Sequence, residues 1–222
     1  MKNLTLIIPA KQEHDSLPIF LKELENFSCH ISVILEDNDE QTKNCLNEFK
    51  EIEIILQKNK GYGSAIIEGI NKCSTEYCCI INADGSMSPK YLKKMLEDCK
   101  NNDFIFASRY LKPGGGSEDD TFITFIGNKI FTLIGNILYD LNISDILFTF
   151  ILGKTSSFKS LNLKSQDFRL CVEIPIKAKK KNYIYSSIAC FERKRIAGFK
   201  KVNEFKDGFL ILCGMFNYIF KK

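Results

Sequence analysis

The most informative segment of this chain is Cys78-Cys79-Ile80-Ile81-Asn82-Ala83-Asp84-Gly85-Ser86. Its apolar half has the length of a buried strand, and its polar half is a turn that contains an acid and a glycine. A helix is predicted to begin just after it, at Ser88-Pro89. Asp84 is therefore expected at the carboxyl end of a strand, the edge at which open α/β sheets bind ligands. A carboxylate there is suited to hold a divalent cation against phosphate oxygens, or simply to cap the next helix.

The composition is that of one sizeable globular domain. The chain has 222 residues, of which 45% are apolar and 26% charged, and this length buries an ample core. The formal net charge is +4, and basic residues gather in the last quarter, at 177–181, 193–195, 200–201 and 221–222. A basic end suits an anionic partner such as a phosphate, a nucleic acid or a membrane surface, although 177–181 is also typical of a solvated face.

The nine cysteines show no paired spacing of a metal site. Several lie in apolar strand-like runs, where a free thiol behaves as a small hydrophobic side chain. We therefore expect reduced thiols and a cytoplasmic protein. The N-terminus enters a predicted strand directly, with no basic leader, long apolar run or cleavage site, so secretion is not expected.

Strands and helices alternate along the first half of the chain. Apolar runs at 4–9, 31–35, 52–56, 77–81 and 103–107 predict five strands with helical patterns between them. Such alternation requires crossover connections, and it predicts an α/β fold with a mainly parallel sheet and helices on both faces. The carboxyl ends of parallel strands meet at one edge. The charged residues expected there are Glu13, Glu36, Asp37, Lys60, Asp84 and Arg109.

Two segments at this edge have more than one interpretation. The polar residues 36–40 include four acids, which suit either a ligand's hydroxyl and imino groups or a solvated loop. Gly61 and Gly63 precede a helix, where glycines let a backbone come close to a ligand and point amide groups at phosphate. They are not a dinucleotide fingerprint, because the third glycine is absent and the motif follows the third strand.

The pattern changes after Arg109. The glycine-rich stretch 112–120 is predicted to be a mobile lid or loop. The helix expected at 122–141 is about long enough to span a bilayer, but its polar interruptions favour a helix that lies on the domain or against lipid. The apolar tail, 207–220, predicts a short helix suited to a membrane interface or to docking on the core. The other predicted elements are strands at 146–152 and 183–191 and a helix over about 167–179.

The order and spacing of these motifs resemble those of the family 2 glycosyltransferases, and within them the dolichol-phosphate mannose synthase branch. The resemblance runs almost the whole length of the chain. The segments that carry it are Pro9-Ala10-Lys11-Gln12-Glu13, Glu36-Asp37, Asn59-Lys60-Gly61 with Gly63, Ala83-Asp84-Gly85, Ser108-Arg109, Gly127-Asn128, Ser144-Asp145, Glu173 and Arg195-x-x-Gly198-x-x-Lys201.

This resemblance implies a single GT-A domain over 1–222, with a Rossmann-like sheet. Residues 1–109 would be the nucleotide-sugar-binding half, 110–201 the acceptor-side half and 202–222 an apolar C-terminal helix. It also implies inverting transfer of a sugar from a nucleotide-diphosphate sugar to a polyprenyl (dolichyl or undecaprenyl) phosphate, with Mg²⁺ or Mn²⁺ on the diphosphate. Peripheral contact with the inner face of the membrane is implied, and a nucleic-acid partner is not.

The resemblance assigns roles by position. The metal would be bound by Asp84 and Asn82. The catalytic groups would be Asp84 together with Arg109, Arg195 and Lys201, which neutralise the donor diphosphate and the acceptor phosphate. The nucleotide sugar would be bound by Pro9, Ala10, Glu13, Glu36, Asp37, Lys60, Gly61 and Ala83.

The nature of the acceptor decides whether a base is needed. A phosphate acceptor is already ionised at pH 7 and needs no strong base, which fits a chain whose two histidines, His14 and His30, are not clearly at a strand end. A hydroxyl acceptor would instead need a carboxylate base, which Asp145 or Glu173 could supply. A transferase to a saccharide hydroxyl therefore remains an alternative.

The sequence also departs from the family's usual pattern. Asn82 stands where the first of two aspartates is usual, Ser86 where glutamine is usual and Thr149 where the branch has glycine. Asparagine offers a neutral carbonyl, so the site loses one formal charge and should bind Mg²⁺ or Mn²⁺ more weakly. A second alternative is therefore a degenerate nucleotide-sugar-binding protein without turnover.

Overall fold

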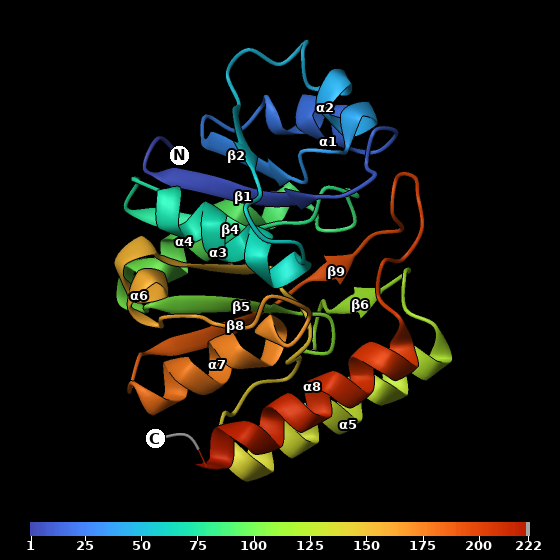
Figure 1. The fold of residues 1–222 in the computed structure, drawn as a ribbon. Coiled ribbons are helices and arrows are strands. Elements are labelled where there is room, and N and C mark those ends of the chain that lie inside the picture. The colour runs from blue at the N-terminus through green and yellow to red at the C-terminus, as the bar shows by residue number, and fades with distance from the viewer. Residues whose placement is uncertain (221–222) are drawn as a thin grey trace.

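A seven-stranded sheet forms the centre of the computed structural model, which describes residues 1–220 (Figure 1). The basic pair expected at 221–222 lies outside the described residues. The strand order is β3-β2-β1-β4-β7-β5-β8. In sequence these strands are β1 (Leu4–Ala10), β2 (His30–Leu35), β3 (Glu53–Leu56), β4 (Tyr77–Ile80), β5 (Phe104–Ser108), β7 (Ile151–Lys154) and β8 (Tyr185–Ala189). Every pairing is parallel except those of β7 with β4 and β5, so the predicted mainly parallel α/β sheet is confirmed.

Helices cover both faces of this sheet (Figure 1). Alternate side chains of β1 separate the two cores: Leu6 and Ile8 pack in one core with Phe20, and Ile7 packs in the other with Ile66. A strand buried on both faces in this way has the continuous apolar sequence seen in β1. The helices are α1 (Leu17–Leu24), α2 (Glu40–Cys45), α3 (Tyr62–Lys72), α4 (Leu92–Asp98), α5 (Phe122–Tyr139), α6 (Thr155–Ser160), α7 (Leu170–Lys180) and α8 (Glu204–Phe220), with short 3₁₀ turns at Pro89–Tyr91 and Cys99–Asn101.

The register of the parallel strands aligns their carboxyl ends. Ala10 at the end of β1 lies beside Leu35 of β2, and Leu35 lies beside Leu56 of β3. The residues that follow these three strands therefore emerge at one edge of the sheet. This is the edge at which the sequence predicts the binding site.

Two predicted strands are shorter than expected. The apolar run 146–152 becomes a strand only at Ile151, because β7 pairs with β4 and β4 ends at Ile80. Residues 146–150 lie beyond the end of β4 and form a buried irregular segment, in which only the Phe150 carbonyl is seen to accept from β5, from the Ala107 amide at 3.0 Å. The run 183–191 divides in the same way: β8 ends at Ala189, opposite the last residue of β5.

The glycine-rich stretch predicted to be a mobile lid is held in place. It contributes β6 (Gly116–Ser117), which pairs in a separate two-stranded sheet with β9 (Phe191–Glu192). The backbone amides of Gly116 and Glu118 donate to the carbonyls of Cys190 and Glu192 at 3.3 and 3.0 Å. The stretch is therefore mostly loop, as expected, but β6 ties it to the end of β8, which the sequence did not predict.

Helices α5 and α8 lie side by side at one end of the molecule (Figure 1). The helix α5 begins with a capping box between Thr121 and Thr124. Ile211 and Met215 of α8 are buried in a third core cluster. The tail helix therefore docks on the domain. Among the described residues, α5 alone has the length and apolarity of a membrane span, which is weak evidence by itself.

Candidate functional site

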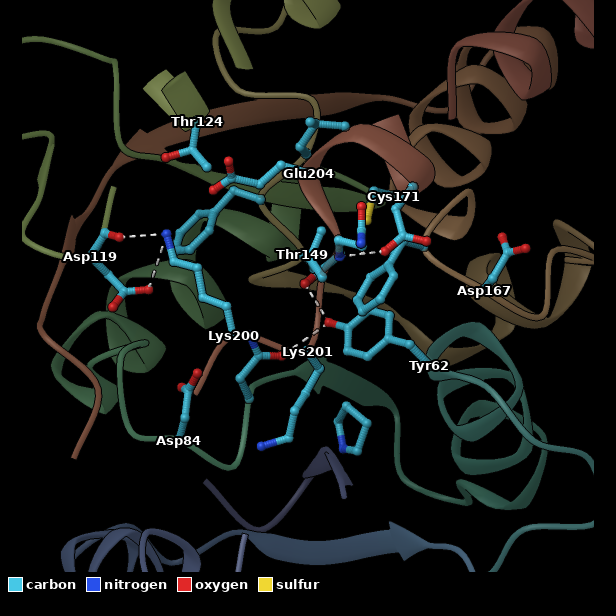
Figure 2. A pocket seen from close by; sticks show the side chains of 18 of the residues that line it. Tyr62, Asp84, Asp119, Thr124, Thr149, Asp167, Cys171, Lys200, Lys201 and Glu204 are labelled. Atoms are coloured by element: carbon cyan, nitrogen blue, oxygen red, sulfur yellow. Dashed lines mark hydrogen bonds and ion pairs between the residues drawn. The ribbon is translucent and has the colours of Figure 1, made fainter. Parts of the chain in front are cut away.

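A cavity of about 980 Å³ lies at the carboxyl edge of the sheet, between the strand ends and the pair α5 and α8 (Figure 2). It unites most of the residues that the sequence predicts for the site. Those lining it are Pro9, Ala10, Glu13, Glu36, Gly61, Asn82, Ala83, Asp84, Arg109, Arg195 and Lys201. Segments separated by almost 200 residues in the chain thus meet in one hollow.

The two remaining predicted residues, Asp37 and Lys60, line a smaller pocket of about 230 Å³. Glu36 and Gln57 line both cavities, so the two are neighbours. Glu36 accepts a hydrogen bond from Lys11 Nζ at 3.0 Å and lies 3.9 Å from Lys60 Nζ. The Asp37 carboxylate is 75% exposed and pairs with a lysine of α2 at 3.0 Å. The acids after β2 thus divide between the cavity wall and a solvated loop.

Asp84 follows β4 in a tight turn, and both of its carboxylate oxygens have partners. Its Oδ1 accepts from the backbone amide and the hydroxyl of Ser86 at 3.0 and 2.8 Å. Its Oδ2 lies 3.5 Å from Arg195 Nη1. The turn needs glycine at position 85, because φ is +73° there and a Cβ would lie 2.4 Å from Ile196 Cδ1. The segment that carries Arg195 therefore packs directly on the central turn.

The donor set around Asp84 fits a cation that is shared with a substrate. The described residues bring no three His, Cys, Asp or Glu side chains together in a metal-binding arrangement. Mg²⁺, however, commonly binds through one or two carboxylates and completes its coordination with substrate phosphates and water. Asp84 can supply that single carboxylate.

Three basic residues of the last quarter, Arg195, Lys200 and Lys201, line the cavity and pair with acids there; Figure 2 shows the two lysines. Arg195 Nη2 and Nε contact the two carboxylate oxygens of Asp119 at 2.6 and 3.2 Å. Lys200 Nζ donates to the Asp119 carbonyl at 2.6 Å, and Lys201 Nζ lies 3.1 Å from Glu13 Oε1. With the contact between Arg195 and Asp84, three cations thus meet three carboxylates in a space that is large enough for an anionic ligand.

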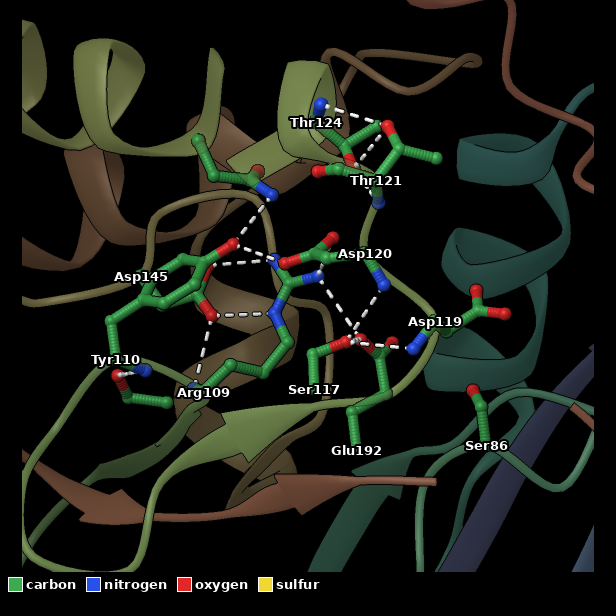
Figure 3. Close-up of polar contacts among 12 residues, drawn as sticks. Ser86, Arg109, Tyr110, Ser117, Asp119, Asp120, Thr121, Thr124, Asp145 and Glu192 are labelled. Atoms are coloured by element: carbon green, nitrogen blue, oxygen red, sulfur yellow. Dashed lines mark hydrogen bonds and ion pairs between the residues drawn. The ribbon is translucent and has the colours of Figure 1, made fainter. Parts of the chain in front are cut away.

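Arg109 is buried in a cluster of three carboxylates (Figure 3). Its Nε and Nη2 donate to the two oxygens of Asp145 at 2.7 and 2.9 Å. Its Nη1 donates to Asp120 at 3.2 Å and to Glu192 at 3.3 Å, and its guanidinium lies 4.6 Å from the centre of the Phe148 ring. Four of the five guanidinium N–H groups are therefore used within the protein.

The two carboxylates considered as bases for a hydroxyl acceptor are both occupied. Asp145 accepts from Arg109 through both oxygens. Glu173 is completely buried and accepts from the backbone amides of Lys164 and Ser165 at 2.8 and 2.7 Å and from Lys177 at 2.6 Å. Burial alone would raise the pKa of Glu173, but these hydrogen bonds outweigh it and lower the pKa. Neither group lies free to accept a proton from a substrate.

The paired glycines serve the packing of the protein itself. A Cβ at Gly63 would lie 2.2 Å from the carbonyl oxygen of Ser165, and one at Gly61, where φ is +120°, would lie 2.2 Å from that of Gln166. The amide of Ser64 donates to the Gln166 carbonyl at 3.0 Å. The backbone that comes close to these glycines is therefore the loop before α7, which also occupies one of the amides expected to face phosphate.

Several cavity residues were not expected from the sequence. Asp119 and Asp120 belong to the stretch predicted to be a mobile lid, and the acid run 118–120 is the only signal that marks them. The Tyr62 hydroxyl reaches across the cavity wall, donating to Asn82 Oδ1 at 3.0 Å and lying 2.6 Å from Thr149 Oγ1. The others with charged groups in the cavity wall include Glu192, Lys200 and Glu204.

One arm of the cavity is apolar. It lies against α5, α8 and the irregular segment before β7, and its lining includes Ile123, Phe131, Leu147, Phe148, Phe205 and Ile211. The cavity therefore has a charged end beside Asp84 and a more apolar end between the two helices, whose lining also includes the polar side chains of Asn128 and Glu204.

Comparisons with known proteins agree with this fold. A model of the family described as Glycosyl transferase family 2 matches residues 5–161, which is more than half of the chain. A dolichol-phosphate mannosyltransferase of Pyrococcus furiosus is 26% identical over 186 residues, which are 79% of this chain and 53% of that protein. An uncharacterized glycosyltransferase of Mycobacterium tuberculosis is 24% identical over 106 residues, which are 47% of this chain and 48% of the relative. The chain thus spans about half the length of these curated relatives.

Solved structures give the same architecture at low sequence identity. Glucosyl-3-phosphoglycerate synthase of Mycobacterium tuberculosis, in complex with Mn²⁺, UDP and phosphoglyceric acid, has a TM-score of 0.76 at 9% identity, covering 99% of this chain and 79% of that one. Its complex with Mn²⁺, UDP-glucose and phosphoglyceric acid has a TM-score of 0.77 at 9% identity, covering 98% and 80%. From the family match and the shared fold together, the chain belongs to glycosyl transferase family 2 and has the GT-A fold.

Proposed function

We propose that this glycosyltransferase moves a sugar from a nucleotide-diphosphate sugar to a polyprenyl phosphate. The observation that carries the proposal is the cavity with one charged and one apolar end. Arg195 and Lys201 lie at the charged end, and Phe131 and Phe205 line the apolar arm. A polyprenyl phosphate has the same two parts, an anionic head and a long apolar chain. The name of the Pyrococcus relative, a dolichol-phosphate mannosyltransferase, supports the same acceptor class.

The nucleotide sugar would occupy the edge of the sheet in the half formed by residues 1–109, and the acceptor would occupy the half formed by residues 110–201. The Mycobacterium glucosyl-3-phosphoglycerate synthase, solved in complex with Mn²⁺ and UDP-glucose, supports a nucleotide-sugar donor and a divalent cation. The residues proposed to bind the donor are Pro9, Ala10, Glu13, Glu36, Asp37, Lys60, Gly61 and Ala83, with Asp37 and Lys60 at the outer pocket.

The site must stabilise the negative charge that develops on the diphosphate leaving group. When bound at Asp84, Mg²⁺ or Mn²⁺ would supply Lewis-acid stabilisation of the diphosphate. Arg195 and Lys201 would add positive charge as their contacts with Asp119 and Glu13 give way to phosphate oxygens. An ionised phosphate acceptor needs no base. This agrees with the structure, in which the carboxylates of Asp145 and Glu173 already accept hydrogen bonds from the protein.

Arg109 has a structural role in this proposal. The sequence resemblance assigns it to phosphate, but four of its N–H groups already bind Asp145, Asp120 and Glu192. It holds the wall of the cavity and its acids in place, so its effect on transfer would come through the shape of the site.

The helices that line the apolar arm also suggest peripheral contact with the cytoplasmic face of a membrane. Ile130, Leu133 and Ile137 recur at helical spacing on α5 and are exposed, as are Phe205 and Phe209 of α8. An amphipathic face of this kind binds at the boundary of the headgroups and the acyl chains. Such contact would bring a lipid phosphate to the cavity.

The test is a transfer assay with a panel of nucleotide sugars, Mn²⁺ or Mg²⁺, and either a polyprenyl phosphate in detergent or soluble saccharides as the acceptor. We expect turnover with the lipid phosphate, and a loss of about a thousandfold in Asp84→Ala because the leaving group loses its stabilisation. Asp98→Ala, which removes an acid of α4 paired with Lys94, is the matched control and should retain turnover. Transfer only to a saccharide would overturn the acceptor class, and binding without turnover would favour the degenerate binding protein.

A further inference from the structure

Asn82 follows β4 at the charged end of the cavity, and its side-chain carbonyl already has a partner in the protein. The Tyr62 hydroxyl donates to Asn82 Oδ1 at 3.0 Å and lies 2.6 Å from Thr149 Oγ1; Figure 2 shows the contact between Tyr62 and Thr149. A phenol has one proton, so a Tyr62 hydroxyl that donates to Asn82 accepts from Thr149. The three side chains therefore form a directed chain of hydrogen bonds that ends on the carbonyl of Asn82.

Tyr62 is held firmly enough to set this direction. Its ring stacks on Phe168 with the ring centres 4.9 Å apart and the planes 23° apart. Burial raises the pKa of its hydroxyl well above the usual value, so the proton that it donates remains at every physiological pH. Thr149 is buried and has no other hydrogen-bond partner for its hydroxyl among the described residues.

Because the amide of Asn82 is planar, its nitrogen Nδ2 points away from Tyr62 when Oδ1 accepts from the Tyr62 hydroxyl. No acceptor within residues 1–220 receives a hydrogen bond from Asn82 Nδ2, and the side chain lines the cavity. An amide nitrogen donates two hydrogen bonds and has no lone pair for a cation. The end of Asn82 left unpaired by the protein is thus a donor, suited to a ligand oxygen.

We propose that Asn82 donates a hydrogen bond from Nδ2, which cannot bind a cation, directly to a diphosphate oxygen of the nucleotide sugar. The inference rests on the proposed function, which brings the diphosphate to Asp84 and Arg195. A carboxylate at position 82 would repel the diphosphate wherever no cation lay between them, whereas the amide attracts it directly. This site therefore binds a nucleoside diphosphate with less need for the cation than a site with two carboxylates.

Calorimetric titration with UDP, GDP, ADP and CDP, in EDTA and in Mn²⁺, tests this role without turnover. We expect the wild-type chain to bind its preferred nucleoside diphosphate in EDTA. Asn82→Asp should weaken that binding about tenfold or more, the range of a hydrogen bond to a charged group, and Mn²⁺ should restore most of it. Asn71→Asp, which adds the same charge at an exposed position of α3, should leave the affinity in EDTA unchanged.

The outcomes separate this inference from the function on which it rests. Equal affinity of the wild-type chain and Asn82→Asp in EDTA would overturn the role of Asn82 alone. Failure of the folded wild-type chain to bind any of the four nucleotides, with or without Mn²⁺, would overturn the donor class and this inference with it. Asn82→Ala provides a second variant without the added charge, and it should also weaken binding in EDTA.

Tyr62 is a positioning residue in this arrangement, and a double-mutant cycle tests it. Tyr62→Phe keeps the stack on Phe168 but removes the hydroxyl that orients Asn82. It should weaken binding in EDTA by about threefold to tenfold in the wild-type background, the range of a neutral hydrogen bond, and by far less in the Asn82→Ala background. Equal losses in the two backgrounds would show that Tyr62 acts independently of Asn82 and would overturn its positioning role.

Discussion

Arg109 and Asp145 form a buried, bidentate ion pair. The guanidinium donates from Nε and Nη2 to the two carboxylate oxygens at 2.7 and 2.9 Å, and the backbone amide of Arg109 adds a third bond at 3.1 Å (Figure 3). Asp145 is 2% exposed and Arg109 is 7% exposed. The pair joins the end of β5 to the segment that follows α5, and Arg109 also lines the cavity.

Arg109→Ala should therefore act first on stability. It leaves Asp145, Asp120 and Glu192 without their shared cation in a buried place, and removal of one partner of a buried pair costs about 3–5 kcal/mol. We expect a loss of this size in the free energy of unfolding, measured by urea denaturation. Lys94→Ala, which breaks an exposed pair on α4, should change it by less than about 1 kcal/mol. An unchanged unfolding curve with weakened phosphate binding would instead return Arg109 to the role of a phosphate ligand.

The sequence could predict that the polar segments meet at one edge of the sheet, because this depends only on the strands and their register. Each polar segment follows an apolar run, and the pairing of Ala10 with Leu35 and of Leu35 with Leu56 brings these segments together. Local patterns suffice for this part of the fold. The motif that contains Arg195 and Lys201 was placed by resemblance to a family, since no periodic pattern connects it to Asp84.

The partners of these cations could not be predicted, because they depend on long-range packing. Asp119 meets Arg195 across 76 residues only because β6 pairs with β9. The glycines before β6 suggest a free loop by composition, and the two-residue strand that holds them is too short to give a periodic signal. Tyr62 and Thr149 likewise come together although they lie 87 residues apart in the chain.

The buried carboxylate of Glu173 should give the protein a measurable pH dependence of stability. Its pKa is lowered below the ordinary 4.5 because hydrogen bonds from Lys177, Ser165 and Lys164 outweigh the effect of burial. A depressed pKa contributes stability that is present above the unfolded value and is lost as the pH falls through the folded value. Glu173→Gln should cost about 2 kcal/mol at pH 7, and this difference should shrink below about pH 4.5.

Thermal unfolding of wild-type chain and Glu173→Gln between pH 3 and pH 8, with urea titrations at both ends of the range, measures this difference. Glu51→Gln, a change at an exposed position, should follow the wild-type curve throughout. Parallel curves for wild type and Glu173→Gln across the whole range would contradict the assignment of the pH dependence to Glu173.

Gly63 packs against the loop before α7, and Gly127 on α5 provides a control that has no such contact. A Cβ at Gly63 would lie 2.2 Å from the Ser165 carbonyl oxygen and 2.8 Å from that of Asp167, whereas a Cβ at Gly127 would meet nothing within 4 Å. Gly63→Ala should therefore destabilise the protein by about 1–3 kcal/mol, the usual cost of overpacking. Gly127→Ala, inside α5, should stabilise it by about 0.5–1 kcal/mol through helix propensity. Urea denaturation of both variants checks the two signs, and a neutral Gly63→Ala would show that the loop moves freely.

The exposed face of α5 should bind lipid if the proposed acceptor is correct. Leu133 and Ile137 are 59% and 71% exposed, and burial of each in a membrane interface would contribute about 1.5–3 kcal/mol. Leu133→Glu combined with Ile137→Glu should therefore weaken binding to vesicles that contain anionic lipids by at least about a hundredfold, measured by co-sedimentation. Transfer to a polyprenyl phosphate dissolved in detergent should remain, because neither side chain lines the cavity. Ile19→Glu, on α1 at the other end of the molecule (Figure 1), places a charge on an equally exposed isoleucine and should leave vesicle binding unchanged. Equal binding by wild type and the double variant would remove α5 from the membrane contact and leave the apolar arm alone to support a lipid acceptor.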